Sequence, residues 1–256
     1  MTTLENIVEE IKKAESIVVL THETPDGDAI GSALGMYNAL KQIGKNPDII
    51  IPECPRNFEF LAGANEIQKE GPNKNYDLAI AVDCATIERL NGWRNYFEHA
   101  NVTINIDHHT KNGMFGDYNY VDPASPACAQ ILIVVLEALN IKINKDIGSC
   151  LLTGIITDTG GFRYQGVSAE TFQFVAWLLQ TGVNVSEIYK KSFQMRTRSS
   201  FELSRIAMDR LEFLEDGKIA FTYITKQDEL EVNAEPGDHE GIVEKGRDIE
   251  GVEVSV

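Results

Sequence analysis

The sequence predicts an α/β fold with a mainly parallel sheet and helices on both faces of it. Segments with the apolar pattern of strands alternate with segments that have the periodicity of helices, which is typical of this class. The strand segments are continuously apolar, as parallel strands buried on both faces usually are. Aspartate follows directly after two of them and histidine lies one residue beyond the end of another, and ligands bind at that end of the strands in such sheets.

The first 185 residues contain the elements of this sheet. Strands are expected at 16–20, 48–51, 77–82 and 102–106. Helices are expected at 3–15, 28–43, 125–139, 144–157 and 168–179. Ser125 has the chemistry of a helix N-cap, so the third of these helices is expected to begin there. Gly31 and Gly35 predict that their helix packs closely on the sheet.

The character of the chain changes after residue 185. The segment 190–210 carries six basic residues, whereas 212–256 has 13 acidic and four basic residues. Two more strands are expected, at 219–224 and 252–256. We therefore predict a catalytic domain over 1–185, a linker over 186–200 and a smaller α/β domain over 201–256.

Composition argues against several classes of protein. The net charge of −16 does not suit a long track for DNA or RNA, because such a track needs a basic surface. A small phosphorylated substrate is compatible with this charge, since bound divalent ions would supply positive charge locally. The four cysteines form no CxxC pair, and residues 1–13 lack the apolar core of a signal peptide. No apolar run is long enough to span a bilayer, so we expect a cytoplasmic protein without membrane contact.

Metal-capable side chains gather where the predicted strands end. His22, Asp83 and Asp107 each follow the last residue of a strand. Because the carboxyl ends of parallel strands lie at one edge of the sheet, we expect these side chains to lie close together. Carboxylates and imidazoles can hold a pair of divalent cations, so the sequence predicts a two-metal site. The same motifs and one predicted helix end contribute Asp26, Asp28, His108, His109 and Asp158.

Each of these residues also has an ordinary structural explanation. Asp28 can cap the helix that follows it, and Asp26 can belong to a Pro-Asp-Gly turn. Asp83 can be a solvated carboxylate, and Asp158 can simply end a helix. Arginine binds phosphate bidentately. The candidates for such a phosphate clamp, which can also be solvated surface residues, are Arg163, Arg196 and Arg198.

The order and spacing of these motifs resemble the DHH phosphoesterase superfamily. The resemblance covers residues 16–163 and consists of His22-x3-Asp26-x-Asp28, then Asp83, then Asp107-His108-His109, then Asp158. Within the superfamily, the chain looks like the nano-RNase / 3′-phosphoadenosine-5′-phosphate (pAp) phosphatase group. The resemblance implies two divalent ions, Mn²⁺, with Asp83 bridging them. It assigns one ion to His22, Asp26 and Asp83, and the other to Asp28, Asp83, His108 and Asp158.

The resemblance also implies an enzyme that hydrolyses short oligonucleotides and removes the 3′-phosphate of pAp. Two bound ions would activate a bridging water for attack on phosphorus. His109 would contact the scissile phosphate, and Asp107 would orient a histidine. Arg163 is not part of the resemblance; as a candidate phosphate clamp just after Gly160 and Gly161, it is expected to be a third catalytic residue. The residues expected to bind substrate are His109, Arg163, Arg196 and Arg198.

The end of the chain departs from the resemblance. Residues 186–256 look like the linker and the start of a DHHA1-like substrate-binding domain. The chain reaches Val256 without the glycine-rich segment ending in histidine that helps this group hold its substrate. We therefore expect an incomplete second domain, which means either a truncated chain or weakened substrate affinity and turnover.

Three other functions stay open. Manganese inorganic pyrophosphatases share the metal motifs, but their Ser-Arg-Lys-Lys-Gln run is absent. A single-strand exonuclease fits the charge and the length less well. A non-catalytic nucleotide-binding regulatory protein would agree with the departure at the C-terminus. The expected oligomeric state is a monomer or a homodimer.

Overall fold

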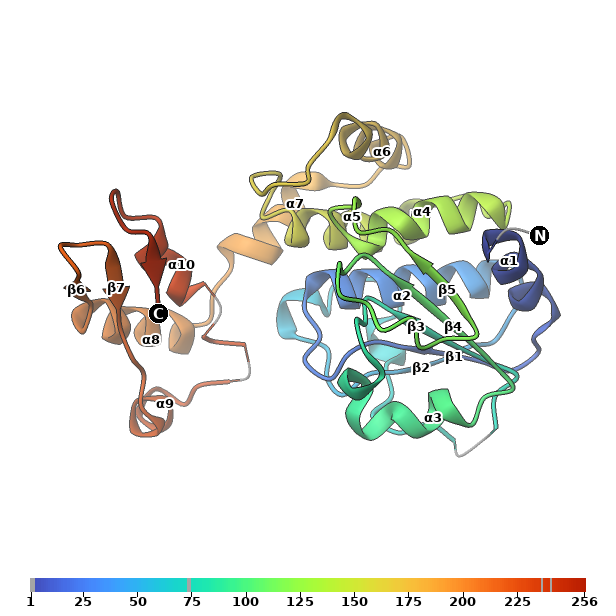
Figure 1. Cartoon of the computed structure of the whole chain (residues 1–256), viewed down its shortest axis with the longest axis horizontal. Helices are drawn as coiled ribbons and strands as arrows, with labels where there is room; N and C mark the ends of the chain where they lie inside the picture. The colour runs from blue at the N-terminus through green and yellow to red at the C-terminus, as the bar shows by residue number, and fades with distance from the viewer. Residues whose placement is uncertain (1–2, 73–74, 236, 240) are drawn as a thin grey trace. The chain divides into compact units, whose positions relative to one another are not determined.

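The structure is a computed structural model that describes residues 3–72, 75–235, 237–239 and 241–256. The chain divides into two compact units, the first ending at Ser192 and the second spanning Phe193–Val256 (Figure 1). The division falls inside the segment 186–200 that was predicted as a linker. Each unit has its own sheet.

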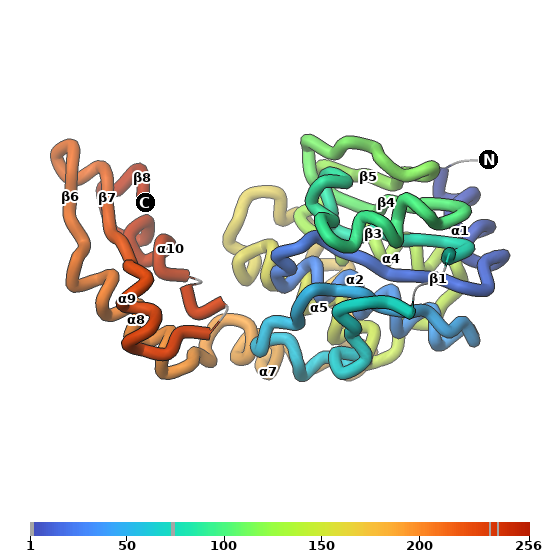
Figure 2. The backbone as a smooth tube through the Cα atoms, turned by 90° about the horizontal axis from the view of Figure 1, so that it is seen from below, coloured from blue at the N-terminus to red at the C-terminus, as the bar shows by residue number. Residues whose placement is uncertain are grey.

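The first unit is built on a parallel five-stranded sheet with the order β2-β1-β3-β4-β5, which Figure 2 shows from β5 to β1. This confirms the predicted α/β class. Strands β1 and β3 are buried at every residue, which explains their continuous apolar sequences. β5 was not predicted, because its half-buried YNYV sequence lacks that apolar pattern. The strands are β1 (Ile17–Leu20), β2 (Asp48–Ile50), β3 (Leu78–Val82), β4 (Val102–Asp107) and β5 (Tyr118–Val121).

Helices cover both faces of this sheet. On one face lie α1 (Thr3–Lys13), α2 (Gly27–Gln42) and α4 (Cys128–Ala138), which pack on the sheet and on one another (Figure 1). α5 (Lys145–Asp158) packs against α2 and α4. On the other face, Leu90 and Phe97 join Tyr76 in an apolar cluster with the strands. Leu90 belongs to the 3-10 helix η3 (Ile87–Trp93) and Phe97 to α3 (Arg94–Glu98). Neither helix was predicted.

The glycines of α2 pack against a helix and not against the sheet, so the predicted contact was wrong in its partner. A Cβ atom at Gly31 would lie 2.5 Å from the carbonyl oxygen of Cys150 in α5. A Cβ atom at Gly35 would lie 2.8 Å from the side chain of Leu151 in the same helix. The absence of side chains at these two positions therefore lets α2 and α5 approach each other closely.

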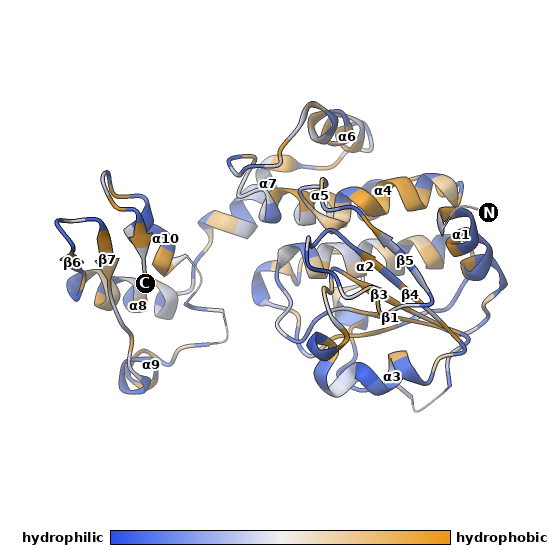
Figure 3. Ribbon diagram, viewed as in Figure 1, coloured by the Kyte–Doolittle hydropathy of each residue, from blue (hydrophilic) through white to orange (hydrophobic). Residues whose placement is uncertain are grey.

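Helix α4 begins three residues later than Ser125, where it was predicted to begin. The Ser125 hydroxyl donates to the Ala127 carbonyl and so does not cap the helix. The N-cap residue is Ala127, which has no side-chain acceptor. Most of α4 is buried, and Figure 3 shows it as largely hydrophobic.

The first unit ends with short helices, and the second unit has a small mixed sheet. β6 and β7 are antiparallel, and β7 and β8 are parallel. Helix α8, which begins in the predicted linker, was not predicted. The remaining elements are η1 (Arg56–Phe58), η2 (Ala64–Glu66), α6 (Ala169–Leu179), α7 (Val185–Tyr189), η4 (Lys190–Gln194), α8 (Arg198–Asp209), β6 (Glu212–Leu214), β7 (Ile219–Phe221), α9 (Lys226–Val232), α10 (Ile242–Arg247) and β8 (Val254–Ser255).

Leu203, Ala207 and Ile242 form the buried core of the second unit. Throughout the part of the chain that the structure describes, no helix combines the length and the apolar character needed to cross a bilayer.

Candidate metal centre

The candidate site lies at the carboxyl edge of the first sheet. His22, Asp83 and Asp107 stand at or just beyond the ends of β1, β3 and β4, as predicted from the strand pattern. The start of α2 and the end of α5 bring further carboxylates to this edge. Three groups of side chains have ligand atoms that all lie within 4.8 Å of one another. They are His22-Asp26-Asp83, Asp28-His108-Asp158 and Asp83-His108-His109.

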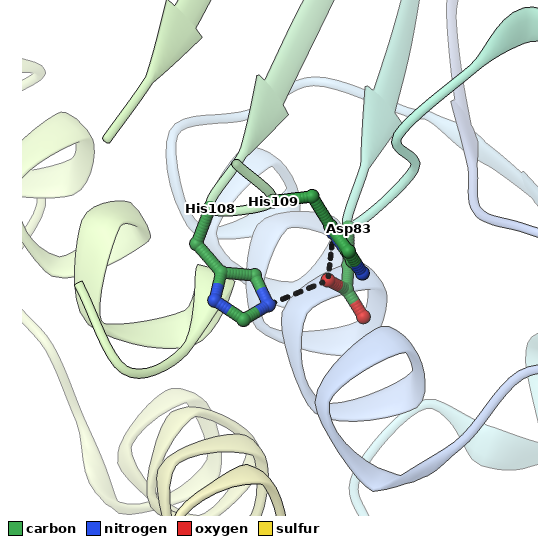
Figure 4. A group of neighbouring side chains, drawn as sticks. All are labelled: Asp83, His108 and His109. Atoms are coloured by element: carbon green, nitrogen blue, oxygen red, sulfur yellow. Dashed lines mark ion pairs between the residues drawn. The ribbon is translucent and has the colours of Figure 1, made fainter. Parts of the chain in front are cut away.

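Asp83 belongs to two of these groups. Its Oδ1 atom is 3.5 Å from His108 Nε2 and 3.7 Å from His109 Nδ1 (Figure 4). Its Oδ2 atom is 3.8 Å from His22 Nε2. The residue is buried, and Oδ1 has no hydrogen-bond partner among the described residues. Since a buried carboxylate oxygen without a partner is costly, a bound cation is the ordinary way to satisfy it.

The backbone at Asp83 adopts a conformation that L-residues rarely use. Its φ is 50°, in the left-handed region, which aspartate tolerates better than most residues. The backbone N–H of Asp83 still donates to Ile106 O of β4, at 3.0 Å. The strand therefore turns sharply just where the carboxylate enters the site, and such local strain often accompanies function.

Asp28 is held by the N-terminus of a different helix. Its carboxylate accepts from the backbone N–H groups of Cys128 at 2.6 Å and Ala129 at 3.0 Å, the first residues of α4. It thus supplies the capping acceptor that Ala127 lacks, with a negative charge at the favourable end of the helix dipole. Burial, together with the carboxylates of Asp83 and Asp158, raises the pKa of Asp28 well above its usual range. A nearby cation would counter that effect and keep the carboxylate ionised.

Asp26 has the capping role and also reaches the site. Its Oδ1 atom accepts from the N–H groups of Asp28 and Ala29, both at 3.0 Å, and so caps α2. The same side chain belongs to the group with His22 and Asp83. His22 is buried, its Nδ1 atom has no hydrogen-bond partner in the described residues, and burial lowers its pKa. Neutral imidazole is the form that ligates metals.

His108 turns one nitrogen toward the carboxylates. Its Nε2 atom is 3.4 Å from Asp158 Oδ2 and 4.0 Å from Asp28 Oδ2. Its Nδ1 atom lies 3.3 Å from the carbonyl oxygen of Ser125, an acceptor that orients the ring. Burial alone would lower the pKa of His108, but the surrounding carboxylates raise it to about 10. The site therefore attracts positive charge at the position of Nε2.

His109 is held by Asp107. His109 Nδ1 lies 2.7 Å from Asp107 Oδ1, and this hydrogen bond raises the pKa of His109. Although Asp107 is buried, its hydrogen bonds to His109 and Asn112 keep its pKa below the usual range. A carboxylate at Nδ1 leaves Nε2 of His109 available for another group. Asn112 was not predicted, because an asparagine in a turn is ordinary and gives no signal of its own.

Asp158 stands in the last turn of α5. Burial raises its pKa to about 6, and the neighbouring carboxylates of Asp83 and Asp26 contribute to that rise. Just beyond it, Gly160 and Gly161 have φ of 57° and 69°, which turns the chain away from the helix.

The three arginines fall in two places. Arg163 follows the Gly160–Gly161 turn, is exposed, and donates from Nε to the carbonyl oxygen of Gly160 at 2.8 Å. Arg196 and Arg198 lie in the second unit, before and at the start of α8. The contact of each with substrate stays a prediction.

The donor set fits divalent metal ions. Four carboxylates and three imidazoles converge, and two buried donor atoms, Asp83 Oδ1 and His22 Nδ1, lack a hydrogen-bond partner within the described ranges. Carboxylates suit Mg²⁺ and Mn²⁺, and imidazole suits the transition metals. The arrangement can therefore gather positive charge for binding a phosphate group.

Comparison with known proteins gives three main findings. Residues 16–155 match the DHH family, N-terminal domain. A Thermus thermophilus protein named bifunctional oligoribonuclease and PAP phosphatase NrnA is 33% identical over 255 residues, or 98% of this chain and 74% of that protein. A Bacillus subtilis protein of the same name is 24% identical over 231 residues, or 88% of this chain and 71% of that protein.

A solved structure extends the similarity to the fold. The crystal structure of an exopolyphosphatase-related protein from Bacteroides fragilis matches with a TM-score of 0.91 at 24% identity. The match covers 98% of this chain and 77% of that chain. The chain thus spans about three quarters of the length of these proteins.

Proposed function

Because this chain belongs to the DHH family, we propose that it is a metal-dependent phosphoesterase that hydrolyses short oligonucleotides and removes the 3′-phosphate of pAp. The observation that carries the proposal is the position of Asp83. Its buried carboxylate lies between three histidines and has an oxygen atom that makes no hydrogen bond in the described part of the chain. Such a carboxylate is suited to bridge two cations.

The names of the relatives support the choice of substrate. The proteins from Thermus thermophilus and Bacillus subtilis are named as oligoribonucleases and PAP phosphatases, which are hydrolases. Transfer of that activity to this chain is part of the proposal. The net charge of −16 agrees with it, because an acidic chain is better suited to short substrates than to long strands.

The proposed metal ligands divide into two sets that share Asp83. One ion would be held by His22, Asp26 and Asp83, and the other by Asp28, Asp83, His108 and Asp158. The first set and the Asp28-His108-Asp158 part of the second support this division, because each forms a group of neighbouring ligand atoms. The two sets together contain four carboxylates and two imidazoles. We propose Mn²⁺, since it is a transition metal that carboxylate ligands suit. When bound, the ions would supply positive charge for the phosphoryl oxygens and lower the pKa of water.

The protein side chains have separate tasks in this proposal. Asp107 holds Nδ1 of His109, so that Nε2 is free to contact the scissile phosphate. A hydrogen bond from that nitrogen would stabilise negative charge that develops on the phosphoryl oxygens. Arg163 is the proposed phosphate contact within the first unit. We assign the second unit, including Arg196 and Arg198, to substrate binding as a DHHA1-like domain, and the enzyme to the cytoplasm.

A panel of substrates tests the proposal. The chain is incubated with Mn²⁺ and, separately, with pAp, a 5′-phosphorylated dinucleotide, pyrophosphate and a long single strand. We expect release of phosphate from pAp and of mononucleotides from the dinucleotide. Release of phosphate from pyrophosphate alone would overturn the proposal in favour of a pyrophosphatase. Tight nucleotide binding without any turnover would overturn it in favour of a regulatory protein.

A further inference from the structure

The side-chain amide of Asn112 binds the oxygen of Asp107 that does not contact His109. We propose that Asn112 is a positioning residue that holds Asp107, and through it His109, in the orientation that the site requires. The inference rests on the proposed function only where it treats His109 as the contact to substrate.

The orientation of the Asn112 amide is decided by its neighbours. Its Nδ2 atom lies 2.7 Å from Asp107 Oδ2 and 2.8 Å from Asn105 Oδ1. Its Oδ1 atom accepts from the backbone N–H of Met114 at 2.6 Å. A carboxylate cannot donate, so the atom that faces Asp107 must be the amide nitrogen. Both of its hydrogens are then used, one on Asp107 and one on Asn105.

The carboxylate of Asp107 is thereby held at both oxygens. Oδ1 binds His109 Nδ1 at 2.7 Å and Oδ2 binds Asn112, within a side chain that is 0% exposed. A carboxylate held at both oxygens cannot rotate to release the histidine. It therefore keeps a proton of His109 on Nδ1 and leaves Nε2 for the contact to substrate.

The same amides connect His109 with the turn at Asp83. Asn105 donates from Nδ2 to the carbonyl oxygen of Cys84 at 3.1 Å. That oxygen also lies 3.4 Å from Asn112 Nδ2. Cys84 directly follows Asp83, the residue with the left-handed backbone. The two asparagines thus join the end of β4 to the end of β3 and hold His109 in register with Asp83.

The substitution Asn112→Asp tests the positioning role, because it keeps the shape of the side chain and the acceptor for Met114. It replaces the donor that faces Asp107 with an acceptor. In the metal-free chain labelled with 15N-histidine, at pH 8, we expect the His109 signal to lose the protonated-Nδ1 form of the parent protein. The His109 signal is assigned by its absence in His109→Gln. In the Mn²⁺-loaded enzyme we expect kcat to fall about 10- to 100-fold, with KM and metal content nearly unchanged.

Two further variants separate positioning from general damage. Asn112→Ala removes the donors without adding charge and is expected to have the same effects. Asn119→Asp is the matched control, since Asn119 lies in the same stretch and its amide bonds the backbone of Gly116 at both of its polar atoms. It is expected to keep the parent spectrum and kcat.

An unchanged His109 signal and kcat in both Asn112 variants would overturn the inference, as would an equal loss in Asn119→Asp. If the parent chain hydrolyses none of the phosphoesters, the proposed function fails. The histidine spectra then still decide whether Asn112 positions His109.

Discussion

At the scale of single residues, Asp83 shows what a strand-end position means in three dimensions. The sequence pattern predicted a carboxylate at the end of a buried strand. In the structure, this carboxylate is buried, lies between imidazoles of two other strand ends, and has a left-handed backbone. A solvated carboxylate, the ordinary alternative, does not agree with its exposed fraction of 2%.

We expect Asp83→Asn to reduce the bound metal from about two ions per chain to one or fewer. An amide offers one neutral oxygen, whereas a carboxylate offers two anionic ones. Elemental analysis after gel filtration in Mn²⁺ measures the ratio. Asp122→Asn, a change at the exposed residue just after β5, is the control and should keep the parent ratio. Unchanged occupancy in Asp83→Asn would refute the bridging role.

The types and positions of the predicted ligands followed from the sequence, because strand ends and helix ends can be recognised from periodicity. The hydrogen bonds that orient them could not be predicted in the same way. Asp28 meets the amide groups of Cys128 and Ala129, a hundred residues away. Asn112 reaches Asp107 only because the chain turns between them. Contacts of this kind depend on the tertiary fold.

At the scale of elements, the crossing of α2, α4 and α5 determines where Asp28 lies. A Cβ atom at Gly154 in α5 would be 2.5 Å from Asp28 Oδ1 and 2.6 Å from the Cβ atom of Ala129 in α4. All three helices therefore meet at this glycine. The space that it leaves is filled by the carboxylate.

We expect Gly154→Ala to destabilise the protein by about 1–3 kcal/mol, because the added methyl group must displace a buried helix or the Asp28 side chain. Urea denaturation followed by circular dichroism measures the change. Gly92→Ala is the matched control, since its Cβ atom would have no neighbour within 4 Å. Equal stability of the two variants would contradict this account of the helix crossing.

The elements that were not predicted have weak local patterns. β5 is half-buried and contains Asn119 between two tyrosines, and η3 contains a non-helical residue, Asn91, within its span. α8 is amphipathic, but it follows a basic stretch that was interpreted as a linker. β5 and η3 acquire their structure from packing against neighbours, which a local pattern does not contain.

At the scale of the whole molecule, the site concentrates negative charge inside an already acidic chain. The effect on stability depends on pH. The pKa of Asp158 rises from 3.8 to about 6, so the stability that its proton contributes is lost as the pH rises through about 6. The pKa of His108 rises to about 10, so its contribution is complete below 6.5 and is lost as the pH approaches 10. Burial lowers the pKa of His22 below 6.5. His22 therefore reduces the stability of the folded chain only as the pH falls through 6.5, and it has no effect on the trend above that pH.

We therefore expect the melting temperature of the metal-free chain to fall by roughly 3–6 °C between about pH 6.5 and pH 9. Mn²⁺ held by the proposed ligands would compete with protons for them, so the loaded chain should lose this dependence or reverse it. Thermal melts by circular dichroism in matched buffers, with chelator and with Mn²⁺, measure both curves. A metal-free chain that becomes more stable toward pH 9 would contradict the expected charge balance of the site.

The most direct test of the central claim is the rate at which the intact chain releases mononucleotide from a 5′-phosphorylated dinucleotide, measured with Mn²⁺, after chelation, and after Mn²⁺ is restored. The account predicts release that stops when the metal is removed and resumes when it returns. Release that continues unchanged without metal, or no release at any Mn²⁺ concentration, would contradict it.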